Sequence, residues 1–252
     1  MDVRDKVVAV TGAARGLGQE FAVALAAAGA RVIVADVNDC AATVDRVGAA
    51  NGEAVALSLD VGDIGSAHAM VEAGVAAFGR LDALVNNAAL YGALHGGRFD
   101  AIDEAEWDAC MAINVKGIWN CCKAAVPAMR HAGGGSIVNI ASLAATYGMP
   151  FGLHYTTSKA AVIGLTRGLA RELGRERIRV NALAPSVVVT EGTREFFGAR
   201  MERALETIKA GQTIQRNLMP SDLTGTVMWL VSDASGFVTG QTIAVDGGTV
   251  ML

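Results

Sequence analysis

The chain has 252 residues, of which 21 are Lys or Arg and 25 are Asp or Glu, so its formal net charge is −4. This acidic balance argues against a protein that binds the phosphate backbone of nucleic acids, because such proteins usually carry a basic domain or stripe. Hydrophobic residues make up 52% of the chain, but the longest uncharged stretch, 131–158, is interrupted by glycines, a proline and hydroxyl residues. It cannot supply the about 20 mainly apolar helical residues that cross a bilayer, and we expect no membrane interaction.

The beginning of the chain and its cysteines predict a cytoplasmic protein. Residues 1–6 lead straight into an apolar segment, without the basic and apolar regions of a secretory signal. Cys40, Cys110, Cys121 and Cys122 form no C-x-x-C pair, which is typical of reduced cysteines that act as small apolar residues. The four histidines lack metal-ligand spacing, so no metal site is expected.

Seven short apolar runs alternate with longer segments of helical spacing along the whole chain. The runs lack polar alternation, as strands buried on both faces of a parallel sheet do. Helical patterns between them end at Gly29, Gly79 and Gly174. The order predicts one α/β domain over 1–252, a Rossmann-like doubly wound sheet of seven parallel strands with helices on both faces. The predicted strands are 7–10, 32–35, 55–59, 81–85, 137–140, 180–183 and 243–245.

A glycine-rich loop follows the first predicted strand and opens the first predicted helix. Gly12, Gly16 and Gly18 stand in the spacing G-x-x-x-G-x-G, with Arg15 and Leu17 between them. Such glycines permit a tight turn and close approach of the backbone to a pyrophosphate, while the helix N-terminus offers free N–H groups. A plain turn is the alternative, but the position within the first β-α-β unit favours a nucleotide site.

Asp36 ends the second predicted strand, 18 residues after Gly18. An acidic residue about 20 residues beyond the glycines accepts hydrogen bonds from an adenine ribose, and its charge repels a 2′-phosphate. Arg15 favours NADP instead, because a cation in the loop can pair with a 2′-phosphate. The residues after Asp36, Val37 and Asn38, supply no second cation. The sequence therefore predicts NAD as the cofactor, with a plain turn-forming role for Asp36 as the alternative.

The next candidate residues lie in the second half of the chain. Asn114 lies inside a long helical segment, about 103–129, where asparagine is unfavourable, so a local break of the helix is expected there. Ser142 follows the strand 137–140, at the edge where open α/β sheets place their sites. Tyr155 and Lys159 come 13 and 17 residues later and are four residues apart, on one face of a helix.

Together these residues resemble the short-chain dehydrogenase/reductase family over almost all of the chain. Further matches are Asp60-Val61, Asn86-Asn87-Ala88-Ala89, Asn181 with Pro185, and Asp246-Gly-Gly248. The resemblance implies that Tyr155 is the general acid/base, that Lys159 binds the nicotinamide ribose and lowers the tyrosine pKa, and that Ser142 donates to the substrate oxygen. It implies that Asn114 holds a water that links Lys159 to solvent; the alternative is a buried side chain bonded to a backbone carbonyl.

The family resemblance also implies the cofactor contacts and the assembly. The implied cofactor contacts are Gly12, Arg15, Gly16, Leu17, Gly18, Asp36, Asp60, Val61, Asn87, Tyr155, Lys159, Pro185, Val188 and Thr190. A homotetramer or homodimer is implied, and Gly164 and Gly168 share one face of the Tyr155 helix, so we expect that helix to contribute a subunit face. The family usually has glycine at the positions of Ala89 and Ser186, which puts the shape of the pocket in question.

The substrate is expected to be a small, hydrophobic or aryl-bearing secondary alcohol or ketone. Residues 186–216 are predicted to form a substrate loop or lid. The ending 239–248 resembles aryl-alcohol dehydrogenases of the family, such as phenylethanol dehydrogenase. Two alternatives stay open: a reductase of 3-oxoacyl thioesters, and a non-catalytic nucleotide-binding regulator. The predicted pocket residues are Leu90, Tyr91, Leu94, Met149, Phe151, Phe196, Phe197 and Met201.

Overall fold

The computed structural model describes residues 1–251, and a parallel sheet of seven strands runs through its middle. The strand order is β3-β2-β1-β4-β5-β6-β7, so the chain reverses its direction of winding between β1 and β4. In open α/β sheets this reversal opens a crevice at the carboxyl ends of the strands. The strands are β1 (Val7–Thr11), β2 (Arg31–Asp36), β3 (Glu53–Ser58), β4 (Ala83–Asn86), β5 (Gly135–Ile140), β6 (Ile178–Pro185) and β7 (Thr242–Val245).

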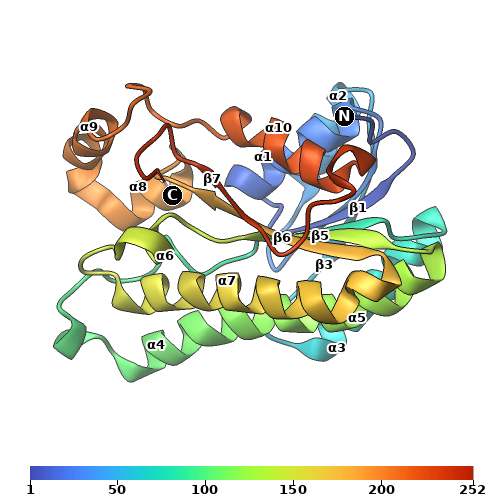
Figure 1. Cartoon of the computed structure of the whole chain (residues 1–252), viewed down its shortest axis with the longest axis horizontal. Helices are drawn as coiled ribbons and strands as arrows, with labels where there is room; N and C mark the ends of the chain where they lie inside the picture. Colours follow the sequence, from blue (N-terminus) through green and yellow to red (C-terminus); the bar gives the residue numbers. More distant parts are fainter. Residues whose placement is uncertain (252) are drawn as a thin grey trace.

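Helices cover both faces of the sheet (Figure 1). One layer contains α1 (Gly16–Ala27), α2 (Ala41–Ala49) and α10 (Ser221–Val231). The other contains α3 (Ile64–Phe78), α4 (Glu104–Met111), α5 (Gly117–Ala132) and α7 (Leu153–Leu173). Three short helices, α6 (Ala144–Tyr147), α8 (Glu191–Phe197) and α9 (Met201–Ala210), lie beyond the carboxyl ends of the strands. The predicted doubly wound fold of one domain is confirmed.

Burial follows the position of each strand in the sheet. The central strands β1 and β4 are buried along their whole length, with an apolar core on each face. The edge strands β3 and β7 are only partly buried, and Glu53 and Ser58 at the two ends of β3 are exposed. The expectation that strands are buried on both faces therefore fails at the edges of the sheet, where each strand has a neighbouring strand on one side only.

Local sequence signals account for several of the helix ends. Asp63 caps α3 by accepting hydrogen bonds from the N–H groups of Gly65 and Ser66, and the helix ends at Gly79, whose φ of 81° suits glycine. The predicted break in the long helical segment is present: residues 112–116, which include Asn114, form a π-helical stretch between α4 and α5. Of the helices found in residues 1–251, none has both the length and the apolar character to cross a membrane.

A buried polar network joins the centre of the sheet to α7. The side chain of Asn139 in β5 accepts a hydrogen bond from Asn86 Nδ2 at 2.8 Å and donates one to Thr166 Oγ1 at 2.9 Å. Thr166 in turn donates to the carbonyl of Val162, one turn earlier in α7. All these side chains are buried. Because partners in a dry core have no water to replace them, the network fixes the position of α7 against β5.

Replacement of Asn139 by alanine is expected to destabilise the fold. The change removes two buried hydrogen bonds, so that Asn86 Nδ2 loses its amide acceptor and Thr166 Oγ1 loses its donor, and the free energy of unfolding should fall by about 2–4 kcal/mol. Urea unfolding followed by circular dichroism measures the change. Asn217→Ala, at an exposed position, is the control and should change stability by less than about 0.5 kcal/mol. Equal stability of the two variants would contradict this role.

Candidate active site

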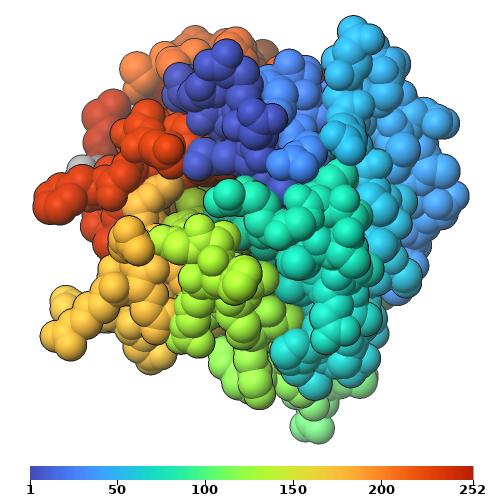
Figure 2. Space-filling model, turned by 90° about the vertical axis from the view of Figure 1, so that its right-hand side faces the viewer, coloured from blue at the N-terminus to red at the C-terminus, as the bar shows by residue number. Residues whose placement is uncertain are grey.

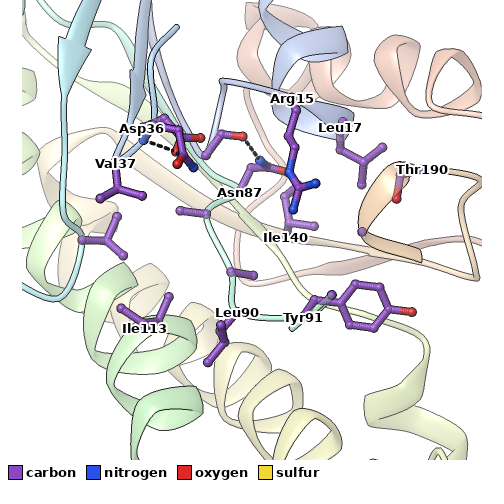
Figure 3. Close-up of a pocket in the computed structure, with 18 of the residues that line it drawn as sticks. Arg15, Leu17, Asp36, Val37, Asn87, Leu90, Tyr91, Ile113, Ile140 and Thr190 are labelled. Atoms are coloured by element: carbon purple, nitrogen blue, oxygen red, sulfur yellow. Dashed lines mark hydrogen bonds between the residues drawn. The ribbon is translucent and has the colours of Figure 1, made fainter. Parts of the chain in front are cut away.

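A cleft of about 560 Å³ lies at the carboxyl ends of the central strands (Figure 3). Asp36, Val37 and Asn38 line one end of it, and Tyr155 and Lys159 line the other. Most of the predicted cofactor contacts meet here although they are far apart in sequence. Those that line the cleft are Gly12, Arg15, Gly16, Leu17, Asp36, Asp60, Val61, Asn87, Tyr155, Lys159 and Thr190.

The glycine loop forms the floor of the cleft and the start of α1. Gly12 and Gly16 have positive φ angles of 64° and 60°, which favour glycine. A Cβ on Gly12 would lie 2.7 Å from the Cα of Ala88, and one on Gly18 would lie 2.2 Å from the carbonyl oxygen of Gly12. Gly18 therefore serves the packing of the loop and does not line the cleft, in contrast to its predicted role as a direct contact.

The N-terminus of α1 is left open toward the cleft. No side chain caps this helix, whereas Asp63 and Asp103 cap α3 and α4. An uncapped N-terminus leaves backbone N–H groups and the positive end of the helix dipole available to an anion. Asn87 holds the loop in place, because its Nδ2 donates to the carbonyls of Thr11 and Gly12. This end of the cleft fits the pyrophosphate of a dinucleotide.

The charged residues of the cleft have well-defined partners. The carboxylate of Asp36 accepts hydrogen bonds from Ala14 N at 3.0 Å, Asn38 N at 2.9 Å and Asn38 Nδ2 at 3.0 Å, so it is both a turn former and a cleft residue. The guanidinium of Arg15 donates to both carboxylate oxygens of Glu195 in α8 and lies 3.5 Å from Glu191. Arg15 is thus neutralised by two acidic residues whose link to it has no signature in the sequence.

Ser142, Tyr155 and Lys159 come together where β5 meets α7. The Lys159 ammonium donates to the carbonyl of Ile140, the last residue of β5, at 2.8 Å. Ser142 accepts a hydrogen bond from Ala144 N at 3.1 Å, and its hydroxyl acts to lower the pKa of the neighbouring Tyr155. Ser142 and Tyr155 face a second cavity of about 100 Å³, and Tyr155 lines both spaces. Tyr155 is therefore placed between the cleft and a smaller cavity.

Burial shifts the pKa values of Tyr155 and Lys159 in opposite directions. Burial raises the pKa of Tyr155 to about 12, although the hydrogen bond from Ser142 opposes the shift. Burial lowers the pKa of Lys159 to about 8. Both shifts favour the neutral form, because a low-dielectric site disfavours charge. The family resemblance implies a lowered pKa for Tyr155. The protein groups by themselves raise it.

Asn114 lies behind the cleft rather than in it. Its Oδ1 accepts a hydrogen bond from Leu90 N at 2.7 Å, and its Nδ2 donates to the Leu90 carbonyl and to Ser158 Oγ, both at 3.1 Å. The side chain is fully buried. Asn114 thus ties the loop after β4 to α7, one residue before Lys159. These contacts match the alternative of a buried asparagine bonded to backbone; its water-holding role stays a prediction.

The smaller cavity contains the remaining predicted residues of the site. Pro185 and Val188 line it rather than the cofactor cleft, together with Ser186, Tyr147 and Met149. Tyr91 lines both spaces, a position between them that its sequence context does not show. Its ring lies 4.8 Å from that of Tyr155 and stacks at 4.8 Å on Phe196 of α8, which meets Phe197 edge-on at 5.2 Å.

The predicted substrate pocket is only partly reproduced. Tyr91, Met149 and Leu90 line one of the two spaces or both. Leu94 is buried in the protein and Phe151 is 62% exposed, so neither is a pocket residue in this structure. Sequence reasoning missed Ile113, which lines the cleft, whereas Glu191 and Gly192, which also line it, lie within the predicted loop 186–216. Ile113 directly precedes Asn114, so its place next to a predicted catalytic residue could have indicated that it lies at the site.

Comparisons with known proteins agree with this geometry. A family model described as enoyl-(acyl carrier protein) reductase matches residues 12–250. A 2-dehydro-3-deoxy-D-gluconate 5-dehydrogenase of Dickeya dadantii is 38% identical over 252 residues, covering 98% of this chain and 96% of the relative. A 3-oxoacyl-(acyl-carrier-protein) reductase of Thermotoga maritima is 36% identical and is covered in full, as is this chain.

A solved structure extends the match to three dimensions. A short chain dehydrogenase from Mycobacterium paratuberculosis, bound to NAD, superposes with a TM-score of 0.90 and 36% sequence identity, covering 99% of both chains. The chain belongs to the short-chain dehydrogenase/reductase family and is an oxidoreductase of that family.

The lowered pKa of Lys159 predicts a specific dependence of stability on pH. The folded protein releases this proton near pH 8, whereas the unfolded chain holds it to about pH 10.5, so stability rises with pH between these values. Relative to Lys159→Met, the free energy of unfolding of the wild type should rise by about 3 kcal/mol over this range. Urea titrations at a series of pH values measure it.

The matched control is Lys123→Met, since Lys123 lies on the surface of α5 over the ring of Trp119. Its curve should run parallel to that of the wild type. A Lys159→Met curve that also runs parallel to that of the wild type would show that the fold does not lower the pKa of the Lys159 amine.

Proposed function

We propose that the protein is an NAD-dependent alcohol dehydrogenase or ketone reductase that acts on secondary alcohols and ketones. The observation that carries the proposal is the position of Tyr155, which lines both a dinucleotide-sized cleft and a smaller cavity and shares the smaller cavity with Ser142. A proton donor at such a boundary can act on a substrate oxygen in the cavity while a cofactor occupies the cleft. When bound, NAD supplies the nicotinamide that accepts or returns a hydride.

Each of the four predicted catalytic residues has its own role in the proposed reaction. Tyr155 takes a proton from the alcohol or returns it to the carbonyl, and Ser142 donates a hydrogen bond to the same substrate oxygen as charge develops there. Lys159, held by the Ile140 carbonyl, keeps an amine beside the tyrosine and facing the cleft. Asn114 fixes the loop after β4 against α7, so that the two walls of the site stay in register.

NAD is the cofactor that the cleft fits best. The uncapped N-terminus of α1 accepts a pyrophosphate, and Asp36 at the end of the cleft accepts hydrogen bonds from the ribose. A 2′-phosphate would meet the charge of Asp36, and Arg15 is already paired with Glu195. A relative of known structure binds NAD. Of the remaining predicted contacts, Thr190 lines both the cleft and the smaller cavity, and Pro185 and Val188 line the smaller cavity alone.

The smaller cavity favours an apolar or aryl-bearing substrate. Its walls include Leu143, Met149, Val187 and Tyr147, and the ring of Tyr91, which also lines it, stacks on Phe196 of α8. Apolar walls that surround a few polar groups are typical of such sites. Residues 186–216 contain α8, whose contacts with Arg15 and Tyr91 hold it over the site, and they are proposed to act as a lid.

A reductase of 3-oxoacyl thioesters is the second candidate. The Thermotoga maritima relative with that name matches over its full length, whereas the Dickeya dadantii relative is named for 2-dehydro-3-deoxy-D-gluconate. Activity on acyl thioesters that exceeds activity on free ketones would favour this candidate. A non-catalytic nucleotide-binding regulator would bind NADH tightly without turnover on any substrate.

An assembly of two or four copies is proposed as the working form. A Cβ built onto Gly164 or Gly168 of α7 would meet no atom within 4 Å, and Trp119 on α5 is 46% exposed. A small-residue face on one helix and an exposed indole on another suit helix packing between subunits.

Tyr155→Phe tests the proposed reaction. Initial rates with NAD and a panel of secondary alcohols, from short aliphatic to aryl-bearing, should show kcat/KM for the variant reduced roughly a thousandfold, since the proton-transferring hydroxyl is gone. Tyr147→Phe makes the same chemical change in the same small cavity and should retain most of the activity. Turnover by Tyr155→Phe at the wild-type rate would refute the assignment.

Asp36→Asn tests the cofactor preference. The amide keeps the size of the side chain but removes the charge that repels a 2′-phosphate, so the ratio of kcat/KM for NADP to that for NAD should rise about tenfold or more. Asp39→Asn is the control, because Asp39 is exposed and lies outside the cleft. An unchanged ratio in Asp36→Asn would mean that another residue sets the preference.

A further inference from the structure

A second polar cavity lies at the opposite edge of the sheet from the active site. It measures about 250 Å³ and is formed where the amino ends of β1, β4, β5 and β6 meet the last residues of α5 and α10. Figure 2 shows this face: the dark-blue N-terminal segment, the teal segment near residue 80, the yellow-green segment near 133 and the orange-red segment near 233 surround a hollow. The cleft and the smaller cavity share no lining residue with it.

The cavity is positively charged in an acidic protein. Four cationic side chains and two carboxylates line it, so its net charge is +2, whereas the whole chain carries −4. The cations are Lys6, Arg80, Arg177 and Arg179, and the carboxylates are Asp82 and Asp233. Concave walls of one sign raise the local concentration of an oppositely charged ligand.

Both carboxylates already have partners, which leaves the other cations free. Asp82 accepts hydrogen bonds from Val7 N at 2.9 Å and from Arg80, and its side chain is only 11% exposed. Asp233 pairs with Lys6 at 2.8 Å and is 93% exposed, at the rim of the cavity. Arg177 lines the cavity with its positive charge. Within residues 1–251, its guanidinium makes no ion pair or hydrogen bond.

Arg179 supplies a donor that is fixed in place and unused. Its Nη2 donates to the carbonyls of Leu230 and Ser232 at 2.9 and 3.2 Å, which orients the guanidinium. Its Nη1 is buried and has no hydrogen-bond partner in the part of the chain that the structure describes. A buried donor on a charged group is costly to leave unpaired, so its position beside three further cations points to an anionic partner.

The ends of α5 and α10 explain only part of this arrangement. Helix C-termini carry partial negative charge and attract cations, and the bonds from Arg179 to Leu230 and Ser232 are of this kind. Arg80 is held by Asp82 and Lys6 by Asp233, and within residues 1–251 the Arg177 guanidinium makes no bond to a helix carbonyl. The helix ends and the two carboxylates therefore account for three of the four cations and leave the Arg177 side chain without a partner in the described part of the chain.

We propose that this cavity, lined by Lys6, Arg80, Arg177 and Arg179, is a binding site for a phosphate group, either free or as the terminal phosphate of a small metabolite. Arginine forks match the oxygens of a tetrahedral oxyanion, and the volume accommodates one such group with its nearest substituent but not a dinucleotide. The site lies across the sheet from the reaction centre and is independent of the proposed dehydrogenase activity.

Calorimetric titration with inorganic phosphate, at constant ionic strength and with saturating NADH in the cleft, tests the site. The wild type should bind phosphate saturably, and Arg177→Gln should bind it roughly tenfold more weakly through loss of a charge-assisted hydrogen bond. Arg175→Gln removes an exposed arginine two residues away that does not line the cavity, and it should bind like the wild type. Arg179→Lys keeps the charge but removes the fixed Nη1 donor and should also bind more weakly.

The same titration with glycerol 3-phosphate separates the two sources of the phosphate. Tighter binding of the ester identifies a phosphorylated metabolite, and equal or weaker binding identifies the free ion. Three results would overturn the proposal: no saturable binding, equal binding by wild type and Arg177→Gln, or binding seen only in a parallel titration from which NADH is omitted, since the last would place the phosphate on the glycine loop. Because Arg177 is exposed and makes no side-chain bonds within residues 1–251, its variant should fold as the wild type does, and thermal unfolding checks this.

Discussion

The hydrogen bond from Lys159 to the carbonyl of Ile140 is the contact on which the geometry of the site depends. It joins α7 to the last residue of β5 in a buried position. Ser142 follows Ile140 by two residues, and Tyr155 precedes Lys159 by one helical turn, so this single contact helps to bring the serine and the tyrosine to the same cavity. The Asn139 and Thr166 network holds the same strand and helix together further along.

This constraint keeps Tyr155 at the boundary between two spaces and also removes it from water. The same burial raises the pKa of the phenol and lowers that of the amine, so the protein alone favours neutral forms of both. The contacts of Tyr91 extend the wall of the site from Tyr155 to α8. Its ring lies between Tyr155 and Phe196, and the Arg15–Glu195 pair ties the same helix, α8, to the glycine loop. The proposed lid is thus anchored on both sides of the cleft.

The sequence predicts the framework of this protein better than its side-chain contacts. Strands, their parallel order and the edge that carries the site follow from apolar runs, glycines and the rule that open sheets bind ligands at strand ends. The break at Asn114 follows from the poor fit of asparagine inside a helix. The partners of Arg15 do not follow, because Glu195 lies 180 residues away and no local pattern links them. Gly18 likewise resembles a ligand contact in the motif, yet the close approach of Gly12 gives it a packing role.

The most direct test of the proposed chemistry follows the reacting hydrogen itself. A secondary alcohol that carries deuterium at its carbinol carbon is incubated with NAD and the enzyme, and the recovered NADH is examined by mass spectrometry. The proposed mechanism predicts one deuterium in the NADH formed by the wild type and no such product above background with Tyr155→Phe. Deuterium transfer that is equally fast in Tyr155→Phe, or NADH without deuterium from the wild type, would contradict it.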